Sequence, residues 1–437
     1  MDEQRLTTSE LRDVWALLSG EERIDGFHHV DPAEADNFFL GLSAREQAQM
    51  LLSMQPGERR LWLRLLPPDD VADTVQQVPK EERAGLLDLL DDASRREVTA
   101  LLAYAEDAAG GLMSPRFARL RPEMTVDEAI RYLRRQARER LETIYYAYVL
   151  DHEQRLCGVV SFRDLFAAPQ NTLLADVMHT AVISVEDTLD QESVARVMAE
   201  HDLNAIPVVD ENGRMKGIVT IDDVVDVVQR EATEDIQKLG GMEALETPYM
   251  QTSLGALIKK RAGWLSVLFV GELLTASAMG RYQDEIARAV ILALFVPLII
   301  SSGGNSGSQA TTLIIRALAL GEITLKDWWR IIRRELAAGL VLGLILAMLG
   351  LIRVIAWQAL FHSYGEHYLG IALAVAVSLV GVVTWGTVAG SMLPMVIRRL
   401  GADPASASAP FVATLVDVSG LIIYFNVSRV ILSGSLL

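Results

Sequence analysis

The pattern of apolar and charged positions changes near residue 261. Charged side chains occur almost everywhere before this point, whereas five long apolar segments follow it. A helix needs about 20 mostly apolar residues to cross the hydrocarbon core of a membrane, and buried helices of soluble proteins rarely reach this length so often. We therefore predict five membrane spans, at about 262–280, 286–320, 335–360, 369–397 and 409–432.

Short helices are predicted for residues 1–107, because apolar residues recur at helical spacing and prolines interrupt them. Pro67 and Pro68 begin one of these helices, which places Asp69 and Asp73 at positions i and i+4 on one face. Two carboxylates in this arrangement repel each other unless a cation lies between them. A solvated acidic turn at a helix N-terminus is the alternative interpretation.

A unit of about 60 residues occurs twice between residues 111 and 230. Each copy reads as helix, strand, turn, strand and helix, and each ends in G-x-x-[ST]-x-x-D, at 158–164 and 217–223. The repeat resembles a tandem pair of cystathionine-β-synthase (CBS) domains, which implies an α/β fold and, in some members, a bound nucleotide. The residues that match the ribose contacts are Ser161, Asp164, Thr220 and Asp223, with Arg163 near the phosphates. A purely structural pair without nucleotide is the alternative.

An acidic helix is predicted after the second copy, leading toward the first span. Its carboxylates are Asp222, Asp223, Asp226, Glu231, Glu234 and Asp235. Arg230 and Lys238 are the bases nearby that offset them. Such a surface repels itself unless cations bridge it, and a hard divalent ion with oxygen ligands suits it.

The second span contains a cluster of Gly, Ser and Asn residues at 301–309. We expect this cluster to break or kink the helix, and irregular backbone at this depth is tolerated only inside protein or beside a water-filled cavity. Asn305 and Gln309, four residues apart, favour a polar lining. Close packing of helices through small residues is the alternative.

Asp417 lies in the middle of the fifth span. A carboxylate there costs about 2.5–3.5 kcal/mol on insertion scales, and no Lys or Arg lies within one turn of it. We therefore expect Asp417 to face a cavity, an ion or a proton path. Glu272 in the first span is a second acid, for which a proton or water contact and a plain hydrogen bond between helices both remain open.

Charge also predicts orientation and excludes some partners. Lys and Arg concentrate before the first span, between the second and third, and after the fourth, so these segments are predicted to be cytoplasmic. The N-terminus is then inside, where the charged, non-apolar start of the chain also places it, and the C-terminus is periplasmic. The net charge of -17 argues against nucleic acid as a partner. One cysteine, Cys157, excludes a disulfide framework.

Together these features resemble the MgtE family of magnesium channels over the whole chain. The specific elements are G-G-N-x-G-x-Q at 303–309 and A-T-L-x-D-V-x-G-L at 413–421, in this order after the CBS pair. The resemblance implies a multidomain protein with five parts. These are an all-α acidic N-domain (1–107), two α/β CBS domains (108–172 and 173–230), a connecting or plug helix (231–258) and a five-span α-helical pore domain (259–437).

The resemblance also implies a homodimer in the bacterial inner membrane, with the pore between the subunits. Asp417 would contact hydrated Mg2+, with Ala413 and Asn305 close by, and Asp403 would contact the ion on the cytoplasmic side. Regulatory ions would bridge acids of the N-domain, the CBS pair and the connecting helix. The matching positions are Asp69, Asp73, Asp202, Asp223, Asp226, Glu231, Glu234 and Asp235. ATP binding would involve Tyr146, Arg163 and Asp164.

The expected function is Mg2+ uptake through a channel that closes when cytosolic Mg2+ binds the acidic residues. No H-E-x-x-H motif and no P-loop occur in the chain, so an intramembrane metalloprotease and an ATP-driven pump are disfavoured and no enzyme activity is expected. A CBS-regulated secondary transporter of another divalent cation remains open, because Asp417 and Glu272 could couple to protons. A scaffold is the weakest alternative, since it gives Asp417 no role.

Overall fold

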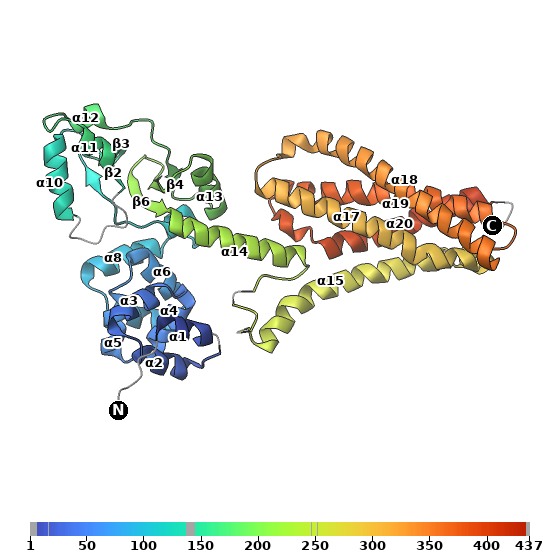
Figure 1. Ribbon diagram of the computed structural model, residues 1–437, viewed down its shortest axis with the longest axis horizontal. Coiled ribbons are helices and arrows are strands. Elements are labelled where there is room, and N and C mark those ends of the chain that lie inside the picture. Colours follow the sequence, from blue (N-terminus) through green and yellow to red (C-terminus); the bar gives the residue numbers. More distant parts are fainter. Residues whose placement is uncertain (1–6, 16, 137–144, 246, 251, 434–437) are drawn as a thin grey trace. The chain divides into compact units, whose positions relative to one another are not determined.

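The structure is a computed structural model that describes residues 7–15, 17–136, 145–245, 247–250 and 252–433 (Figure 1). The chain forms two compact units, Met1–Glu231 and Ala232–Leu437. Their boundary falls within helix α14 (Ile221–Leu239). Each unit is described by itself.

The first unit begins with eight short helices, in agreement with the prediction. They are α1 (Thr8–Trp15), α2 (Gly20–His28), α3 (Pro32–Leu40), α4 (Ala44–Ser53), α5 (Pro56–Leu63), α6 (Pro68–Gln76), α7 (Lys80–Leu87) and α8 (Asp92–Leu101). Proline occupies the first turn of α3, α5 and α6, where its missing N–H costs nothing. The rings of Phe27, Phe39 and Trp62 pack within 5.0–6.5 Å of one another in the core.

The repeat predicted from the sequence forms two sheets of equal topology. The first contains β1 (Arg119–Leu120), β2 (Tyr146–Leu150) and β3 (Leu156–Ser161), and the second β4 (Val185–Glu186), β5 (Ala205–Val209) and β6 (Met215–Thr220). In both sheets the first strand pairs parallel with the second, which pairs antiparallel with the third. The accompanying helices are α9 (Ala109–Leu112), α10 (Val126–Gln136), α11 (Phe162–Ala167), α12 (Leu174–Val177) and α13 (Gln191–Glu200).

Five helical segments of the second unit are long and apolar enough to cross a membrane. The elements are α15 (Leu254–Arg281), α16 (Gln283–Arg288), η1 (Val290–Phe295), α17 (Val296–Ala319), η2 (Leu325–Asp327), α18 (Trp328–Phe361), α19 (Tyr368–Arg399), η3 (Pro404–Ser406) and α20 (Ala409–Leu432). Helix α19 is the most buried of the five and packs against α17, α18 and α20. Helices α15 and α18 begin at Leu254 and Trp328, earlier than the predicted 262 and 335, because each continues through a segment that contains Lys or Arg.

Glycines bring α17 and α19 into close contact. A Cβ atom at Gly386 would collide with the carbonyl oxygen of Gly303, and one at Gly390 with the carbonyl oxygen of Gly307. The two backbones therefore touch directly, which side chains of any size would prevent.

The prediction of a break in the second span at 301–309 was wrong at that position. Helix α17 runs without interruption through this segment, and the irregular part is η1, which precedes it. Two hydroxyl groups on the buried face of α17 bond to α19: the Ser306 and Thr387 hydroxyls lie 2.8 Å apart, and Thr311 donates to the Gly390 carbonyl at 2.7 Å. Packing of small residues, the alternative interpretation, accounts for the cluster.

The connecting segment at 231–258 is also less helical than predicted. Helix α14 ends at Leu239, and α15 does not begin until Leu254. Gly241 adopts a left-handed conformation with φ of +72°, which glycine accepts without strain. The chain therefore turns between two helices instead of continuing as one.

Candidate functional sites

Asp417 lies where three membrane helices meet. It is half-buried on α20, and the carboxyl group of Glu272 on α15 lies next to its own. From α17, the position that a Cβ would take at Gly304 is 3.8 Å from Asp417 Oδ1 and 3.4 Å from Ala413. The structure thus brings together the two membrane motifs that the sequence singled out, and adds Glu272.

Helix α17 presents two different faces beside this point. Gly303, Ser306 and Gly307 are buried, whereas Asn305 and Gln309 are exposed. The exposed amides are therefore not covered by side chains of the described residues of this chain. A polar stripe at membrane depth requires water, an ion or another subunit to satisfy it.

Asp403 occupies the loop between α19 and α20. Its Oδ1 atom caps η3 by accepting from the Ala405 N–H at 2.8 Å, and its Oδ2 atom accepts from Lys238 Nζ at 2.6 Å. The same ammonium group contacts Glu234 one turn earlier on α14. Burial lowers the pKa of Lys238, but its hydrogen bonds to Asp403 and Glu234 outweigh burial and raise that pKa overall.

Sequence reasoning named Lys238 as a base that offsets the acids of this helix, but it missed the contact of Lys238 with Asp403. Glu234 and Lys238 stand at i and i+4, the spacing of a favourable helical ion pair, and this was the available signal. Their third member, Asp403, is 165 positions away from Lys238. No periodicity in the sequence connects positions so far apart.

The acids of α6 are buried or half-buried in the first unit. Asp69 is 6% exposed and accepts a hydrogen bond from the Ser114 hydroxyl at 3.2 Å. Burial raises the pKa of Asp73 from 3.8 to about 7, while the positive charge of Arg230 lowers it and Asp70 adds to the rise. The interpretation of these acids as a solvated turn therefore does not hold, because neither carboxyl is freely solvated.

The remaining candidate ligands lie on α14 or just after α13. Asp223 accepts from the Thr220 hydroxyl at 2.7 Å, and Glu231 accepts from the Gln191 side-chain amide at 2.6 Å. The others, which are exposed or half-buried on α14 or just after α13, are Asp202, Asp226 and Asp235. Within the described ranges, no three His, Cys, Asp or Glu side chains converge as metal ligands do.

The candidate nucleotide residues gather at one end of the first sheet. Tyr146 and Ser161 are paired across β2 and β3, and the Ser161 hydroxyl donates to Asp164 at 2.6 Å. This bond, with a smaller contribution from His179, holds the pKa of Asp164 below its usual value. The Ser–Asp pair forms the capping box of α11, a local role that [ST]-x-x-D spacing could have indicated. Arg163 is exposed next to it.

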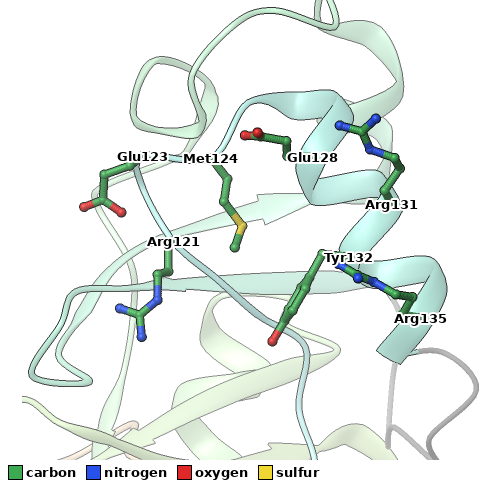
Figure 2. Close-up of a pocket in the computed structure, with 7 residues that line it drawn as sticks. All are labelled: Arg121, Glu123, Met124, Glu128, Arg131, Tyr132 and Arg135. Atoms are coloured by element: carbon green, nitrogen blue, oxygen red, sulfur yellow. The ribbon is translucent and has the colours of Figure 1, made fainter.

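A hollow of about 600 Å³ lies at the opposite end of the same sheet. It is lined by Arg121, Glu123, Met124, Glu128, Arg131, Tyr132 and Arg135. Arg121 follows β1, whose Leu120 pairs with Val149 rather than with Tyr146. Figure 2 shows Arg121 and Arg131 at opposite sides of the hollow, with Tyr132 between them. The guanidinium groups do not converge, and two glutamates offset their charge.

Comparisons with known proteins match every part of the chain. The family model described as MgtE intracellular N domain matches residues 6–107, the CBS domain model matches 109–171 and 174–230, and the model described as divalent cation transporter matches 296–427. The cytosolic domain of the Mg2+ channel MgtE, crystallised in complex with ATP, shares 45% identity with a TM-score of 0.48, covering 52% of this chain and 92% of that one.

Two curated relatives extend over nearly the full length. The magnesium transporter MgtE of Thermus thermophilus is 43% identical over 434 residues, which is 99% of this chain and 94% of the relative. The magnesium transporter MgtE of Enterococcus faecalis is 32% identical and covers 96% of this chain and 97% of the relative. The chain, a multi-pass membrane protein, therefore belongs to the MgtE family of magnesium transporters.

Proposed function

We propose that the chain forms a Mg2+ channel that mediates Mg2+ uptake and closes when cytosolic Mg2+ binds its acidic residues. The observation that carries the proposal is Asp417, a carboxylate at mid-membrane where α15, α17 and α20 meet. Relatives that match the whole chain are named magnesium transporters, and their cargo suits an all-oxygen site.

The pore is proposed to lie between two subunits. Asn305 and Gln309 form a polar stripe on α17 that the described part of one chain leaves uncovered, and a second copy would enclose it. Mg2+ sheds its water reluctantly. Two Asp417 carboxylates, together with the backbone carbonyl of Ala413, would therefore hold the hydrated ion through its waters. Pore width and oxygen placement would then provide selectivity.

The gate is proposed to depend on charge in the cytosolic unit. The acids on α6 and α14 are costly to hold together without cations. Burial is the main cause that raises the pKa of Asp73 to about 7, and the negative charges of Asp70 and Glu106 add to this rise. Bound Mg2+ would supply the missing positive charge and favour the closed arrangement, a shift in population driven by differential binding. The proposed ligands are Asp69, Asp73, Asp202, Asp223, Asp226, Glu231, Glu234 and Asp235, with Asp403 at the cytoplasmic mouth.

We further propose ATP as a ligand of the first CBS domain. Tyr146, Ser161, Arg163 and Asp164 lie together at one end of its sheet, where a ribose hydroxyl could replace Ser161 as donor to Asp164. The exposed Arg163 guanidinium suits a phosphate.

The protein is proposed to reside in the bacterial inner membrane with a cytoplasmic N-terminus and a periplasmic C-terminus. Lys and Arg concentrate at the helix ends that we propose to be cytoplasmic: Arg333 and Arg334 lie in the second turn of α18, and Arg398 and Arg399 end α19. Neither nucleic acid nor an enzymatic reaction is part of the proposal.

Mg2+ flux into liposomes tests the pore. Asp417→Asn and Asp417→Ala are expected to abolish uptake followed by a Mg2+-sensitive dye. Asp284→Asn serves as the matched control, because Asp284 is an exposed acid between the first two spans and its loss should leave uptake intact. Normal uptake by the Asp417 variants would remove this residue from the pathway.

A secondary transporter of another divalent cation is the second candidate. The proximity of Glu272 to Asp417 favours it, because two adjacent carboxyl groups can exchange a proton for a cation. Single-channel currents would exclude this mechanism, since carriers lack them. Uptake that requires a proton gradient and shows no unitary currents would exclude the channel.

A further inference from the structure

A three-membered ion pair joins the end of α14 to the loop before α20. Lys238 Nζ lies 2.6 Å from Asp403 Oδ2 and also contacts Glu234. The three side chains are partly shielded from solvent, with exposed fractions of 27% for Lys238 and 39% for Asp403. The ammonium group therefore lies between two carboxylates, one from each side of this joint.

Close packing also holds this joint, by which we mean the contact of the end of α14 with the loop before α20. Leu239, next to Lys238, packs against Ile315, Ala405 and Ala407. Gly241, two residues after Leu239, approaches Trp264 so closely that a Cβ would lie 2.8 Å from the indole ring.

The same indole continues the joint to the start of α20. Trp264 Nε1 donates to the Ser408 hydroxyl at 3.0 Å, and this hydroxyl also caps α20 by accepting from the Phe411 N–H at 3.3 Å. The end of α14 thus contacts the residues that set the start of the helix carrying Asp417.

We propose that Lys238 acts as a tethered cation that fixes the end of α14 to the mouth of the pore domain. It fills the space between Glu234 and Asp403 that a divalent cation would otherwise bridge. Two carboxylates facing each other without a cation repel. A lysine on the same helix neutralises them without a binding equilibrium, so the joint can persist when Mg2+ is scarce. As a regulatory element, this lock rests on the proposed gating function.

Mg2+ and Lys238 would compete for the Glu234 and Asp403 carboxylates in this arrangement. Mg2+ carries twice the charge of the ammonium group and binds oxygen ligands, but it must displace Lys238 to reach this pair. Removing the lysine therefore has two effects: the joint opens when Mg2+ is absent, and it closes again when Mg2+ is added. With Lys238 present, the joint should respond weakly to Mg2+.

Spin-label distances in the full-length protein test the lock. Labels at Ile236→Cys and Leu400→Cys in a Cys157→Ser background report on the joint, and both positions are exposed, by 70% and 79%. In a chelator, Lys238→Met is expected to raise the ratio of long to short distances about tenfold. Lys238→Arg should keep the short distance, and added MgCl2 should restore it in Lys238→Met.

Two further variants separate the lock from general effects. Lys259→Met removes an exposed cation near the start of α15 and should leave the distances unchanged. Asp403→Asn keeps an oxygen to cap η3 but removes the charge, and should reproduce the effect of Lys238→Met. Gel filtration confirms that each variant is folded and of unchanged assembly.

The lock is overturned if Lys238→Met and Asp403→Asn give wild-type distances in the chelator, or if Lys259→Met moves them equally. This readout does not require transport. Distances that depend on Lys238 in a protein without Mg2+ flux would refute the proposed function and leave the lock. Normal flux with distances that ignore Lys238 would refute the lock alone.

Discussion

Replacing Asp73 with Asn is expected to stabilise α6 at pH 8 and to leave its stability unchanged at pH 4. Burial raises the pKa of Asp73 from 3.8 to about 7, Arg230 lowers it, and Asp70 and Glu106 raise it. The folded chain therefore binds this proton more tightly than the unfolded chain does. The cost of the buried charge is felt only when the proton is lost.

The sign of the pH dependence follows from linkage. Below pH 3.8 the carboxyl is protonated in both states, and above about pH 7 it is ionised in both. Between these values the unfolded chain binds fewer protons than the folded chain, so stability falls as the pH rises. The interval from 3.8 to about 7 corresponds to a loss of about 4 kcal/mol. Asn carries no such proton and removes the slope.

Hydrogen exchange of the full-length protein measures this effect in peptides that contain α6. Comparing variant and wild type at each pH, in a chelator, cancels the intrinsic exchange rate. The protection ratio should rise from about 1 at pH 4 to as much as about a thousandfold at pH 8. Asp36→Asn on the exposed side of α3 should give no change. A protection ratio that does not vary with pH would refute the assignment of this charge to Asp73.

Three further predictions concern packing, capping and the pore. Gly390→Ala should lower the stability of the detergent-solubilised protein by about 1–3 kcal/mol, because the new Cβ would collide with the Gly307 carbonyl. Gly255→Ala is the control, because a Cβ at that position has free space. Equal melting temperatures of the two variants would contradict this prediction. Ser161→Ala should cost about 1 kcal/mol without any nucleotide, since it removes the cap of α11, and unchanged chemical denaturation would argue against it. Asn305→Ala should reduce Mg2+ uptake several-fold without lowering the melting temperature, because Asn305 is exposed; unaltered uptake would exclude it from the pathway.

The pattern of residues along the chain was sufficient to predict the five spans and the repeat, because each of these features extends over many consecutive residues. The fifth span was predicted at 409–432, and α20 has these bounds. The second span was predicted less well. A cluster of Gly and Ser is compatible with a broken helix and with close packing, and the partner glycines, Gly386 and Gly390, lie on another helix. A local pattern cannot distinguish these two outcomes.

Some residues of the candidate sites could likewise be identified from the sequence, whereas others could not. Asp417 could be singled out alone, because a charge at mid-membrane is costly wherever the other helices lie. Its neighbour Glu272 and the Lys238–Asp403 pair required the fold, since these contacts join residues more than 140 positions apart. Ser161 and Asp164 show a further limit, because one motif serves both as a helix cap and as a candidate ligand set.

Two basic residues of α14 each lie close to an acidic residue and offset its charge. Arg230 acts on Asp73 in the first unit, and Lys238 acts on Asp403 in the second. Each base is held by the chain at an acid that we propose as a Mg2+ ligand, so it offsets repulsion without loss of translational freedom. Mg2+ then has to compete with a cation that never diffuses away. The concentration of Mg2+ that closes the channel would therefore be set by this competition as much as by the carboxylates themselves.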